Sequence, residues 1–488
     1  MSAEGLAKQA SAAPPLVVDL DGTLTRGDVF SEAILRFLVA APWRIFTLIG
    51  WFMKGRAYAK QRLAEAAPFD PADLPYNIEL IDWIKSEKAR GRTIVLATAA
   101  DAAAAHAVAE HVGVFDAVFA SDGHINLKSA AKSQALVEAY PQGFVYAGNE
   151  TADLKVWAAA EQAVIVNAPK SLTARAGREF KVEKSFAPAP NGLRAFVKAI
   201  RPQQWAKNVL VFVPMMIGQG WADIAAWQNA FIAFWALSFT ASSVYLVNDA
   251  ADIDADRRHA RKRRRPFASG VLNPLVGVAA SFALLAIGVT LAAQAGALFY
   301  ILAYLVATTL YTFWLKRVVL VDVFVLAGLY TLRVVLGGVA TGYIASGWLL
   351  AFSCFFFLSL ALVKRVAEVD ALAAKGGGAL SRRGYLHTDG AILKAMGLSA
   401  GFISTLVLAL YLQEPSNASQ YGEPFLLWAT PAAMVFWLCR IWLITERGHM
   451  HDDPLVYAFR DRVSWLIGAV VALSFGAAVL LPPDTLSW

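Results

Sequence analysis

The chain has 488 residues, of which 57% are hydrophobic and 17% charged, and its formal net charge is +7. This composition is too apolar for an ordinary soluble domain, and it excludes a disordered chain, a disulfide-rich secreted scaffold and a typical nucleic-acid-binding protein. The first 200 residues carry a net charge of +1 and the remaining 288 carry +6, so the positive excess belongs to the more apolar part. Cys354 and Cys439 lie inside apolar runs, where we expect buried free thiols and no disulfide.

Residues 1–185 alternate strand-length apolar runs with Ala-rich helical stretches, which is the pattern of a parallel α/β sheet. The runs are PLVVDL, TIVLAT, GFVYAG and AVIVNA. The N-terminal stretch lacks a basic segment followed by an apolar one, so we expect no signal peptide. A stretch rich in Pro, Ala and Gly then predicts a linker. We place an α/β domain at 1–185, the linker at 186–200 and an all-α membrane domain at 201–488.

Two carboxylates follow the first predicted strand, in the sequence Asp19-Leu20-Asp21-Gly22-Thr23. At the carboxyl end of a parallel strand they would lie where α/β folds bind ligands. The segment resembles the DxDGT motif of the haloacid dehalogenase superfamily, and the resemblance covers about residues 14–170. It implies a phosphatase in which Asp19 is the nucleophile and Asp21 is the acid, so that hydrolysis proceeds in two steps.

The same resemblance supplies two residues that would bind the phosphoryl group. Thr98, at the end of the second strand run, would bind a phosphoryl oxygen. Lys132 would neutralise its charge, with Lys128 as the alternative.

The last expected motif of this domain, residues 148–153, departs from the family pattern. Asn149 stands where a first acid is usual, although Asp153 and Asp19 can still ligate Mg²⁺ and Glu150 can compensate for the missing charge. Two interpretations stay open: an active phosphatase, and a catalytically silent module that binds phosphorylated partners.

An insertion of cap size, at about 29–75, contains the apolar run 34–53. Arg36, Pro42 and Arg44 interrupt this run, so a membrane-spanning helix is disfavoured. A buried pair of cap helices is the simpler interpretation. Our hypothesis is an interfacial cap that rests on the bilayer and admits a lipid-linked phosphate.

From about Trp205 onward, apolar stretches that approach bilayer-spanning length recur between short polar segments. We expect nine transmembrane helices, at about 206–220, 227–247, 271–292, 297–315, 318–340, 346–363, 391–412, 424–444 and 463–482. The segment 248–270 holds seven basic residues and 364–390 holds five, whereas the opposite loops hold none. The positive-inside rule therefore predicts a cytoplasmic (inner) membrane protein with a cytoplasmic front domain and an extracytoplasmic C-terminus.

The second predicted span ends in a cluster of acids after Asn248. On a continuous helix, Asp249, Asp252 and Asp256 project from one face and Asp254 from the other. Mg²⁺ typically binds one or two carboxylates together with substrate phosphates, so we expect a Mg²⁺–diphosphate site here. The alternative is a solvated acidic helix end that balances the basic run after it.

This NDxxDxxxD pattern resembles the UbiA superfamily of intramembrane prenyltransferases, whose nine-helix fold agrees with the span count, over about residues 195–480. Where ordinary members carry a second paired acidic motif, residues 311–322 offer only Asp322. Further segments resemble the decaprenyl-phosphate phosphoribosyltransferase branch: RPQQWAKN at 201–208, 247–270, YTLRVVLGG at 330–338, KRVAE at 364–368 and AFRDR at 458–462. That branch implies transfer of 5-phosphoribose from phosphoribosyl diphosphate to a polyprenyl phosphate.

The resemblance implies that Asp249 and Asp252 act in catalysis and hold Mg²⁺ together with Asp256. Arg333 is the most informative of the available cations, because a charge well inside a span needs an anionic partner. Snorkelling explains Lys207 and Lys316 almost as well, since both lie near helix ends. The expected substrate-binding residues of this domain are Lys207, Asn248, Tyr311, Lys316, Arg333, Lys364 and Arg365, with Arg317 as a further cation.

The leading hypothesis is a two-part membrane enzyme that uses Mg²⁺, polyprenyl phosphate and phosphoribosyl diphosphate. The membrane domain would make a polyprenyl-phosphoryl 5-phosphoribose, and the front domain would remove its 5-phosphate. The alternative is a UbiA-type prenyltransferase that uses a prenyl diphosphate and an aromatic acceptor, with a silent front domain. A transporter fits poorly, because transporter sites usually lie near the membrane midplane. A homo-oligomer stays open, and no nucleic-acid partner is expected.

Overall fold

The structure is a computed structural model that describes residues 13–122, 126–188, 190–374, 376, 383–450 and 453–482. It divides into two compact units. The front unit comprises Met1–Ile200 and Tyr245–Ser281, and the helical unit comprises Arg201–Val244 and Phe282–Trp488. The sequence boundaries placed 245–281 in the membrane domain, but this segment packs with the front unit.

A six-stranded parallel sheet forms the centre of the front unit, in the order β3-β2-β1-β4-β5-β6. The strands are β1 Leu16–Val18, β2 Ile94–Asp101, β3 Ala117–Ser121, β4 Val145–Gly148, β5 Gln162–Ile165 and β6 Val182–Ser185. The four predicted runs are β1, β2, β4 and β5, which confirms the parallel α/β fold. The two edge strands were not expected. Strand β3 is a short run that is half-buried along most of its length, and β6 alternates half-buried with exposed residues and has no continuous apolar run.

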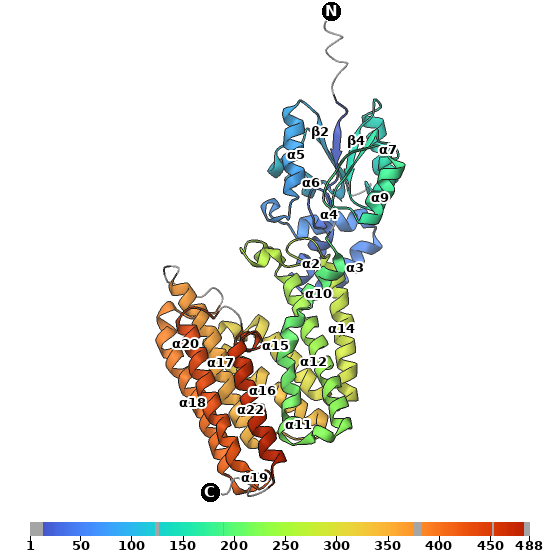
Figure 1. The fold of residues 1–488 in the computed structure, drawn as a ribbon. Coiled ribbons are helices and arrows are strands. Elements are labelled where there is room, and N and C mark those ends of the chain that lie inside the picture. The colour runs from blue at the N-terminus through green and yellow to red at the C-terminus, as the bar shows by residue number, and fades with distance from the viewer. Residues whose placement is uncertain are drawn as a thin grey trace, which may run out of the picture. The chain divides into compact units, whose positions relative to one another are not determined.

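Helices cover both faces of this sheet (Figure 1). Leu16 and Val18 of β1 point into one apolar cluster, which α5 and α6 complete, and Val17 points into another, which α7, α8 and α9 complete. The alternation follows from the two-residue period of a strand. The helices are α5 Ile78–Ala89, α6 Ala102–Val112, α7 Ala130–Ala139, α8 Leu154–Trp157 and α9 Lys170–Glu179.

A helical cap is inserted between β1 and β2. It consists of α2 Val29–Ala40, the 3₁₀ turn η1 Pro42–Arg44, α3 Ile45–Met53, α4 Arg56–Ala66 and the turn η2 Pro71–Asp73. The apolar run 34–53 is broken where expected, because Pro42 starts a new turn after Ala41. The predicted linker is partly helical, since α10 occupies Gly192–Ala199.

Seven helices among the described residues are long and apolar enough to cross a membrane. The α-helices from residue 201 on are α11 Val213–Ile217, α12 Ile224–Ala251, α13 Ile253–Arg257, α14 Pro274–Gln294, α15 Leu298–Phe313, α16 Val321–Thr341, α17 Gly347–Ala373, α18 Gly390–Gln413, α19 Pro415–Ala418, α20 Ala429–Glu446, α21 Pro454–Ala458 and α22 Arg462–Leu480. Helices α12 and α14 contribute residues to both units.

The expected count of nine spans is not confirmed. Helix α15 is apolar but has only 16 residues, and the segment expected as the first span is irregular. It forms the 3₁₀ segment η4 Pro202–Phe212 followed by the short α11, which has Pro214 in its first turn. Proline removes a backbone donor and so limits regular helix here.

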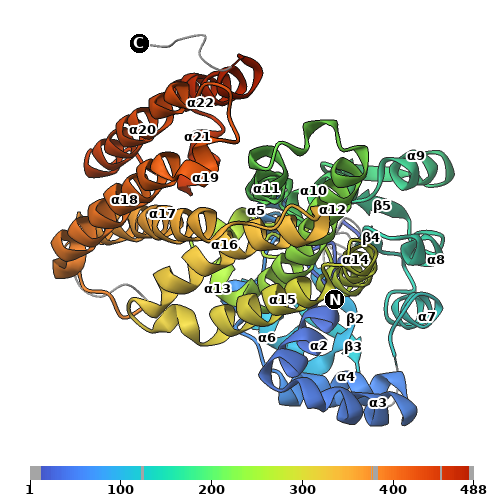
Figure 2. The same cartoon turned by 90° about the horizontal axis from the view of Figure 1, so that it is seen from below.

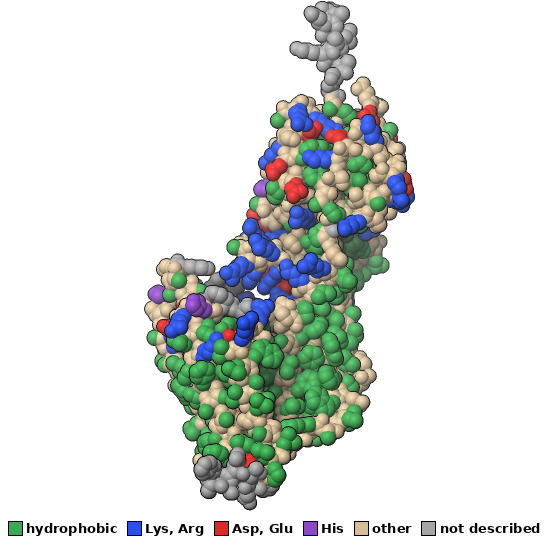
Figure 3. Space-filling view, in the orientation of Figure 1, with side chains coloured by type: hydrophobic (Ala, Val, Ile, Leu, Met, Phe, Trp, Pro, Cys, Tyr) green, Lys and Arg blue, Asp and Glu red, His purple; other side chains and the backbone are tan. Residues whose placement is uncertain are grey.

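Helices α16, α17, α18 and α20 enclose the main apolar core of the helical unit, with Val334, Leu362 and Ile441 almost fully buried (Figure 2). Over these helices the visible surface is mostly hydrophobic, and Lys and Arg gather toward one end (Figure 3). Cys354 and Cys439 are exposed on α17 and α20, so the expectation of buried thiols was wrong. In a membrane protein, the side chains of an apolar run can face lipid as well as the protein core, so an apolar run does not by itself indicate burial.

Candidate active sites

The first site lies at the carboxyl end of β1, where Asp19 is almost fully buried. Lys132 of α7 donates to Asp19 Oδ1 at 2.7 Å and to the Tyr146 hydroxyl at 2.9 Å. The Tyr146 hydroxyl in turn donates to Asp153 Oδ1 at 3.0 Å. The backbone N–H groups of Asn149 and Glu150 bind Asp153 Oδ2, each at 2.9 Å. Lys132 thus binds Asp19 directly and is linked to Asp153 through the Tyr146 hydroxyl.

The two aspartates of the DxDGT segment differ in environment. Burial and the nearby Asp153 raise the pKa of Asp19 to about 6, against the opposing charge of Lys132. Burial and the neighbouring Asp28 hold the pKa of Asp21 well above its usual range, although Asp21 Oδ1 accepts a hydrogen bond from the Val29 N–H at 2.8 Å. A raised pKa favours the protonated form of a carboxyl, and this is the form that can donate a proton.

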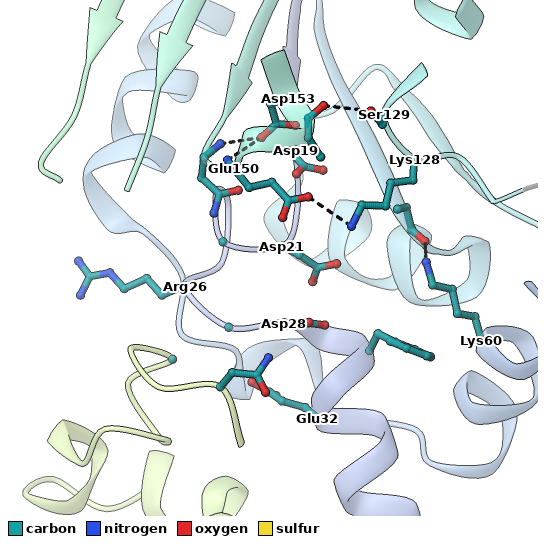
Figure 4. A pocket seen from close by; sticks show the side chains of 18 of the residues that line it. Asp19, Asp21, Arg26, Asp28, Glu32, Lys60, Lys128, Ser129, Glu150 and Asp153 are labelled. Atoms are coloured by element: carbon teal, nitrogen blue, oxygen red, sulfur yellow. Dashed lines mark hydrogen bonds and ion pairs between the residues drawn. The ribbon is translucent and has the colours of Figure 1, made fainter. Parts of the chain in front are cut away.

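These groups line a cavity of about 310 Å³ (Figure 4). The sheet end contributes Asp19, Asp21 and Asp153, and the cap contributes Phe30, Arg56 and Lys60. Residues 270–274, which follow the basic run, complete the wall. The structure thus brings Asp19, Asp21, Lys132 and Asp153 together as the sequence predicted.

One predicted phosphate-binding residue lies elsewhere. Thr98 is fully buried, its hydroxyl accepts from the Ala100 N–H at 3.0 Å, and it does not line this cavity, because the strand continues past it to Asp101. Lys128, the alternative to Lys132, does line the cavity, and its Nζ lies 3.5 Å from a Glu150 carboxyl oxygen.

Sequence reasoning missed Lys60. It donates to Ala99 O and to Asn126 Oδ1 and brings a cap cation to the cavity. No motif surrounds it, so only the fold of the cap could identify it.

Asn149, which replaces the usual acid, has a definite local role. Its Oδ1 accepts from the Thr23 hydroxyl at 3.2 Å, and a Cβ on Gly22 would lie 2.1 Å from its Nδ2. Gly22 has a φ of +74°, so the turn after Asp21 is formed by a glycine that leaves room for this amide. No group of three or more metal-ligating side chains occurs within the described ranges. The Asp19 and Asp153 pair still fits Mg²⁺, which can bind through two carboxylates plus phosphate oxygens.

Two ion pairs, one of them buried, hold the segment 254–274 to the cap. Arg257 binds both carboxyl oxygens of Glu32, at 2.9 and 2.6 Å, and both side chains are almost fully buried. Arg36 binds Asp254 through two hydrogen bonds of 2.8 and 2.7 Å. A Cβ on Gly270 would lie 2.7 Å from the Gly27 nitrogen, so the two backbones touch. The basic run therefore forms specific contacts besides its expected effect on topology.

The acidic motif, residues 249–256, overlaps the start of this segment. Asp249 and Asp256 are buried, and both accept from Arg265 Nη1, at 3.0 and 2.6 Å. Helix α12 ends at Ala251, but backbone hydrogen bonds from Asp252 to Asn248 and from Asp256 to Asp252 continue the helical register. Asp249 and Asp256 thus converge as predicted, with half-buried Asp252 at the junction.

One guanidinium nitrogen already bridges the Asp249 and Asp256 carboxylates, so the pair is arranged around a cation. This donor set fits Mg²⁺, which needs only one or two carboxylates when substrate phosphates supply further oxygens. Asp254 points to a different partner, Arg36, and lies outside the pair.

The helical unit contains a buried guanidinium on α16. A Cβ on Gly337 of α16 would lie 2.0 Å from Val211 O, so only glycine allows η4 to pack this closely. Arg333 donates to Asn208 Oδ1 of η4 at 3.1 Å, to Leu329 O and to the Tyr304 hydroxyl at 3.5 Å. Within the part of the chain that the structure describes, no carboxylate pairs with Arg333, which is 7% exposed. A buried cation without a carboxylate partner is unfavourable, so this site is suited to bind an anion.

Lys207 and Lys364 join Arg333 in a cluster of cations around Tyr330 and Asp453. Lys207 donates to Asp453 Oδ2 at 2.7 Å, and Lys364 lies 3.7 Å from the same oxygen. The Tyr330 hydroxyl also donates to Asp453, and its ring contacts both Lys207 and Arg333. The cluster of three cations and one carboxylate therefore keeps a net positive charge. Sequence reasoning did not single out Asp453, whose only signal was its place at a helix start before a proline.

The remaining predicted residues of the helical unit have different positions. Arg365 is fully buried, forms an ion pair of 2.6 Å with fully buried Asp322 and also pairs with Glu368, so both of its partners are carboxylates of the helical unit itself. Tyr385 also donates to Asp322, which explains why this lone acid is not available as a second metal motif. Tyr311 lies on α15, and Lys316 lies in the following 3₁₀ turn Leu315–Arg317.

The sequence is similar to several known proteins over long stretches. The uncharacterized protein y4nM of Sinorhizobium fredii is 38% identical over 471 residues, which cover 95% of this chain and 91% of that protein. The nodulation protein NoeC of Azorhizobium caulinodans is 35% identical and covers 59% of this chain and 93% of its own length. The decaprenyl-phosphate phosphoribosyltransferase of Mycobacterium tuberculosis is 32% identical over 301 residues, 60% of this chain and 96% of that enzyme.

The chain is a multi-pass membrane protein whose front unit carries the DxDGT aspartates at the end of β1 in a parallel sheet. The model of the UbiA prenyltransferase family matches residues 209–460, which is just over half of the sequence. The chain therefore belongs to the UbiA prenyltransferase family.

Proposed function

We propose that this enzyme transfers 5-phosphoribose from phosphoribosyl diphosphate to a polyprenyl phosphate and that its front unit then removes the 5-phosphate. The observation that carries the proposal is the cluster around Arg333, where buried cations without enough carboxylates call for phosphate. The relative that is 32% identical over almost its whole length is a decaprenyl-phosphate phosphoribosyltransferase, which supports phosphoribose as the transferred group.

In the transfer step, an oxygen of the lipid phosphate attacks C1 of the ribose, and the C1–O bond to diphosphate breaks. Asp249 and Asp256 would hold Mg²⁺, with Asp252 next to them, and the bound ion would supply positive charge to the leaving diphosphate. Arg333, Lys207 and Lys364 would bind phosphate groups of the substrates. By the positive-inside rule, the basic segments 248–270 and 364–390 support a cytoplasmic location for this chemistry.

In the hydrolysis step, ionised Asp19 attacks the phosphorus of the 5-phosphate and Asp21 gives its proton to the departing ribose oxygen. Lys132 lies 2.7 Å from Asp19 and both positions the carboxylate and neutralises phosphate. Water then cleaves the aspartyl phosphate and restores Asp19. Asp19 and Asp153 would hold Mg²⁺ there, which would add positive charge at the phosphoryl oxygens.

The first test offers the purified full chain labelled phosphoribosyl diphosphate with polyprenyl phosphate. We expect a labelled lipid, and we expect Asp249→Asn and Asp256→Asn to abolish it. Asp254→Asn is the matched control, because it removes an acid from the same short segment that faces Arg36 instead. Labelling from geranyl diphosphate into an aromatic acceptor, with none from phosphoribosyl diphosphate, would instead establish a prenyltransferase.

The second test follows the phosphorylation state of that lipid by mass spectrometry. Wild type should yield the dephosphorylated lipid, and Asp19→Asn should accumulate the 5-phosphorylated one. An identical product from both would show that the front unit is catalytically silent.

A further inference from the structure

The cap presents an apolar surface that no described part of the chain covers. Trp43 is 73% exposed, Phe46 76%, Ile49 51% and Met53 84%. Helix α3 buries only Leu48. Aromatic and aliphatic side chains gathered this closely on a surface mark an interaction site, since single exposed apolar residues are ordinary but a contiguous patch is not.

The opposite side of the same helix shows what lies next to it. Leu48 belongs to a small cluster with Phe37 and Leu63, and Leu275 packs against that cluster. Leu275 lies in the first turn of α14, one of the seven helices long and apolar enough to cross a membrane. The next residue of α14, Val276, is already 57% exposed. The side of α3 opposite the exposed one therefore packs beside the start of a helix that is long and apolar enough to cross a membrane.

The charge around the patch favours an anionic surface. Residues 33–64 contain six Lys and Arg and no Asp or Glu. Arg44 precedes α3, and the exposed Lys54 and Arg56 follow it. Amphipathic helices that rest in a membrane interface combine apolar and aromatic residues with flanking cations in this way. Helix α3 has only nine residues, too few to span a bilayer.

We propose that η1 and α3 form a bilayer-docking surface that inserts Trp43, Phe46, Ile49 and Met53 into a membrane with anionic headgroups. The same cap lines the cavity of Asp19 through Phe30, Arg56 and Lys60. Docking therefore holds that cavity at the level of lipid headgroups, so its substrate is a phosphate carried on a lipid. This last step rests on the proposed phosphatase function, whereas the docking itself does not.

The test measures membrane depth on the full chain in vesicles of phosphatidylcholine and phosphatidylglycerol. Cys354 and Cys439 are first replaced by alanine, and a nitroxide is attached through Phe46→Cys or Met53→Cys. Glu138→Cys on α7 is the control, because it is exposed and belongs to the same unit. Both native side chains are largely exposed, so the labels should not disturb folding.

We expect labels at 46 and 53 to collide preferentially with oxygen, which concentrates in lipid, and the label at 138 to collide with a water-soluble nickel chelate. Vesicles of phosphatidylcholine alone should give shallower labels. If the label at 46 behaves like the one at 138, the surface faces water and the proposal is wrong. If it is shielded from both reagents, a second copy or another protein covers the surface, and the proposal is equally wrong.

A kinetic comparison separates this proposal from the phosphatase function. The double variant Trp43→Ser/Phe46→Ser should hydrolyse a lipid-linked phosphate about tenfold more slowly or worse, because two large apolar side chains no longer enter the bilayer. Its hydrolysis of ribose 5-phosphate should equal that of wild type. Wild type that hydrolyses neither substrate would refute the phosphatase function, while the depth measurement would still decide the docking. Equal slowing on both substrates would refute the link between docking and substrate choice.

Discussion

Glu32→Ala removes one partner of the buried pair that joins the cap to the segment after the acidic motif. Arg257, whose side chain is 5% exposed, would lose both of its carboxyl contacts, and Arg36 would lose its 3.2 Å contact with Glu32. Among the described residues, Arg257 would keep its hydrogen bond to Ala268 O. The variant therefore leaves a buried cation without its ion-pair partner.

Breaking a buried ion pair on one side destabilises a protein by about 3–5 kcal/mol. In a unit of about 240 residues, each kcal/mol lowers the melting temperature by roughly 2–4 °C. Glu32→Ala should therefore lower the melting temperature of the front unit by about 6–20 °C. The double variant Glu32→Ala/Arg257→Ala should recover part of this loss, because it leaves no uncompensated charge.

The assay is thermal unfolding of the detergent-solubilised full chain, followed by proteolysis of the front unit at each temperature. Glu65→Ala is the matched control, since its ion pair with Arg62 is half-exposed and should contribute little. A shift for Glu32→Ala no larger than that of Glu65→Ala would refute the reasoning. So would a double variant whose loss equals the sum of the two single losses, because the pair would then carry no coupling.

Other outcomes follow from the two sites. Lys132→Met should reduce phosphate-ester hydrolysis by about 10²–10³-fold and leave lipid labelling intact; a loss of both activities would point to misfolding instead. Arg333→Met should abolish lipid labelling without changing hydrolysis by the front unit, and unchanged labelling would remove Arg333 from the substrate site. Removing Mg²⁺ with a chelator should stop both reactions, and persistence of either would show that its carboxylates need no metal. Although burial opposes ionisation of Asp453, Lys207 and Lys364 lower its pKa from 3.8 to about 2. The stability advantage of wild type over Asp453→Asn should hold above about pH 4 and decline as the pH falls toward 2; an advantage that grows with acidity would contradict this sign.

Local patterns in the sequence were enough for several elements. The run before Asp19 predicts a buried strand, Pro42 breaks the apolar run of the cap, and the spacing of Asp249 and Asp256 places both on one helical side. Each of these rests on helix period, strand period or proline geometry, which depend on neighbours within a few residues.

The partners of the buried charges required the tertiary structure. Lys207 and Asp453 lie 246 positions apart, and nothing near either residue indicates that they meet. Arg365 has the appearance of a phosphate ligand in sequence, but Asp322 neutralises it. The basic segment 248–270 is predicted to set the membrane topology, yet Arg257 within it also binds Glu32 of the cap. Sequence by itself determined the four inner strands, the break in the cap and where acids and cations gather along the chain. Only packing decided which of those charges neutralise one another and which stay available for substrate, because a buried charge is stabilised by whatever distant element the fold brings beside it.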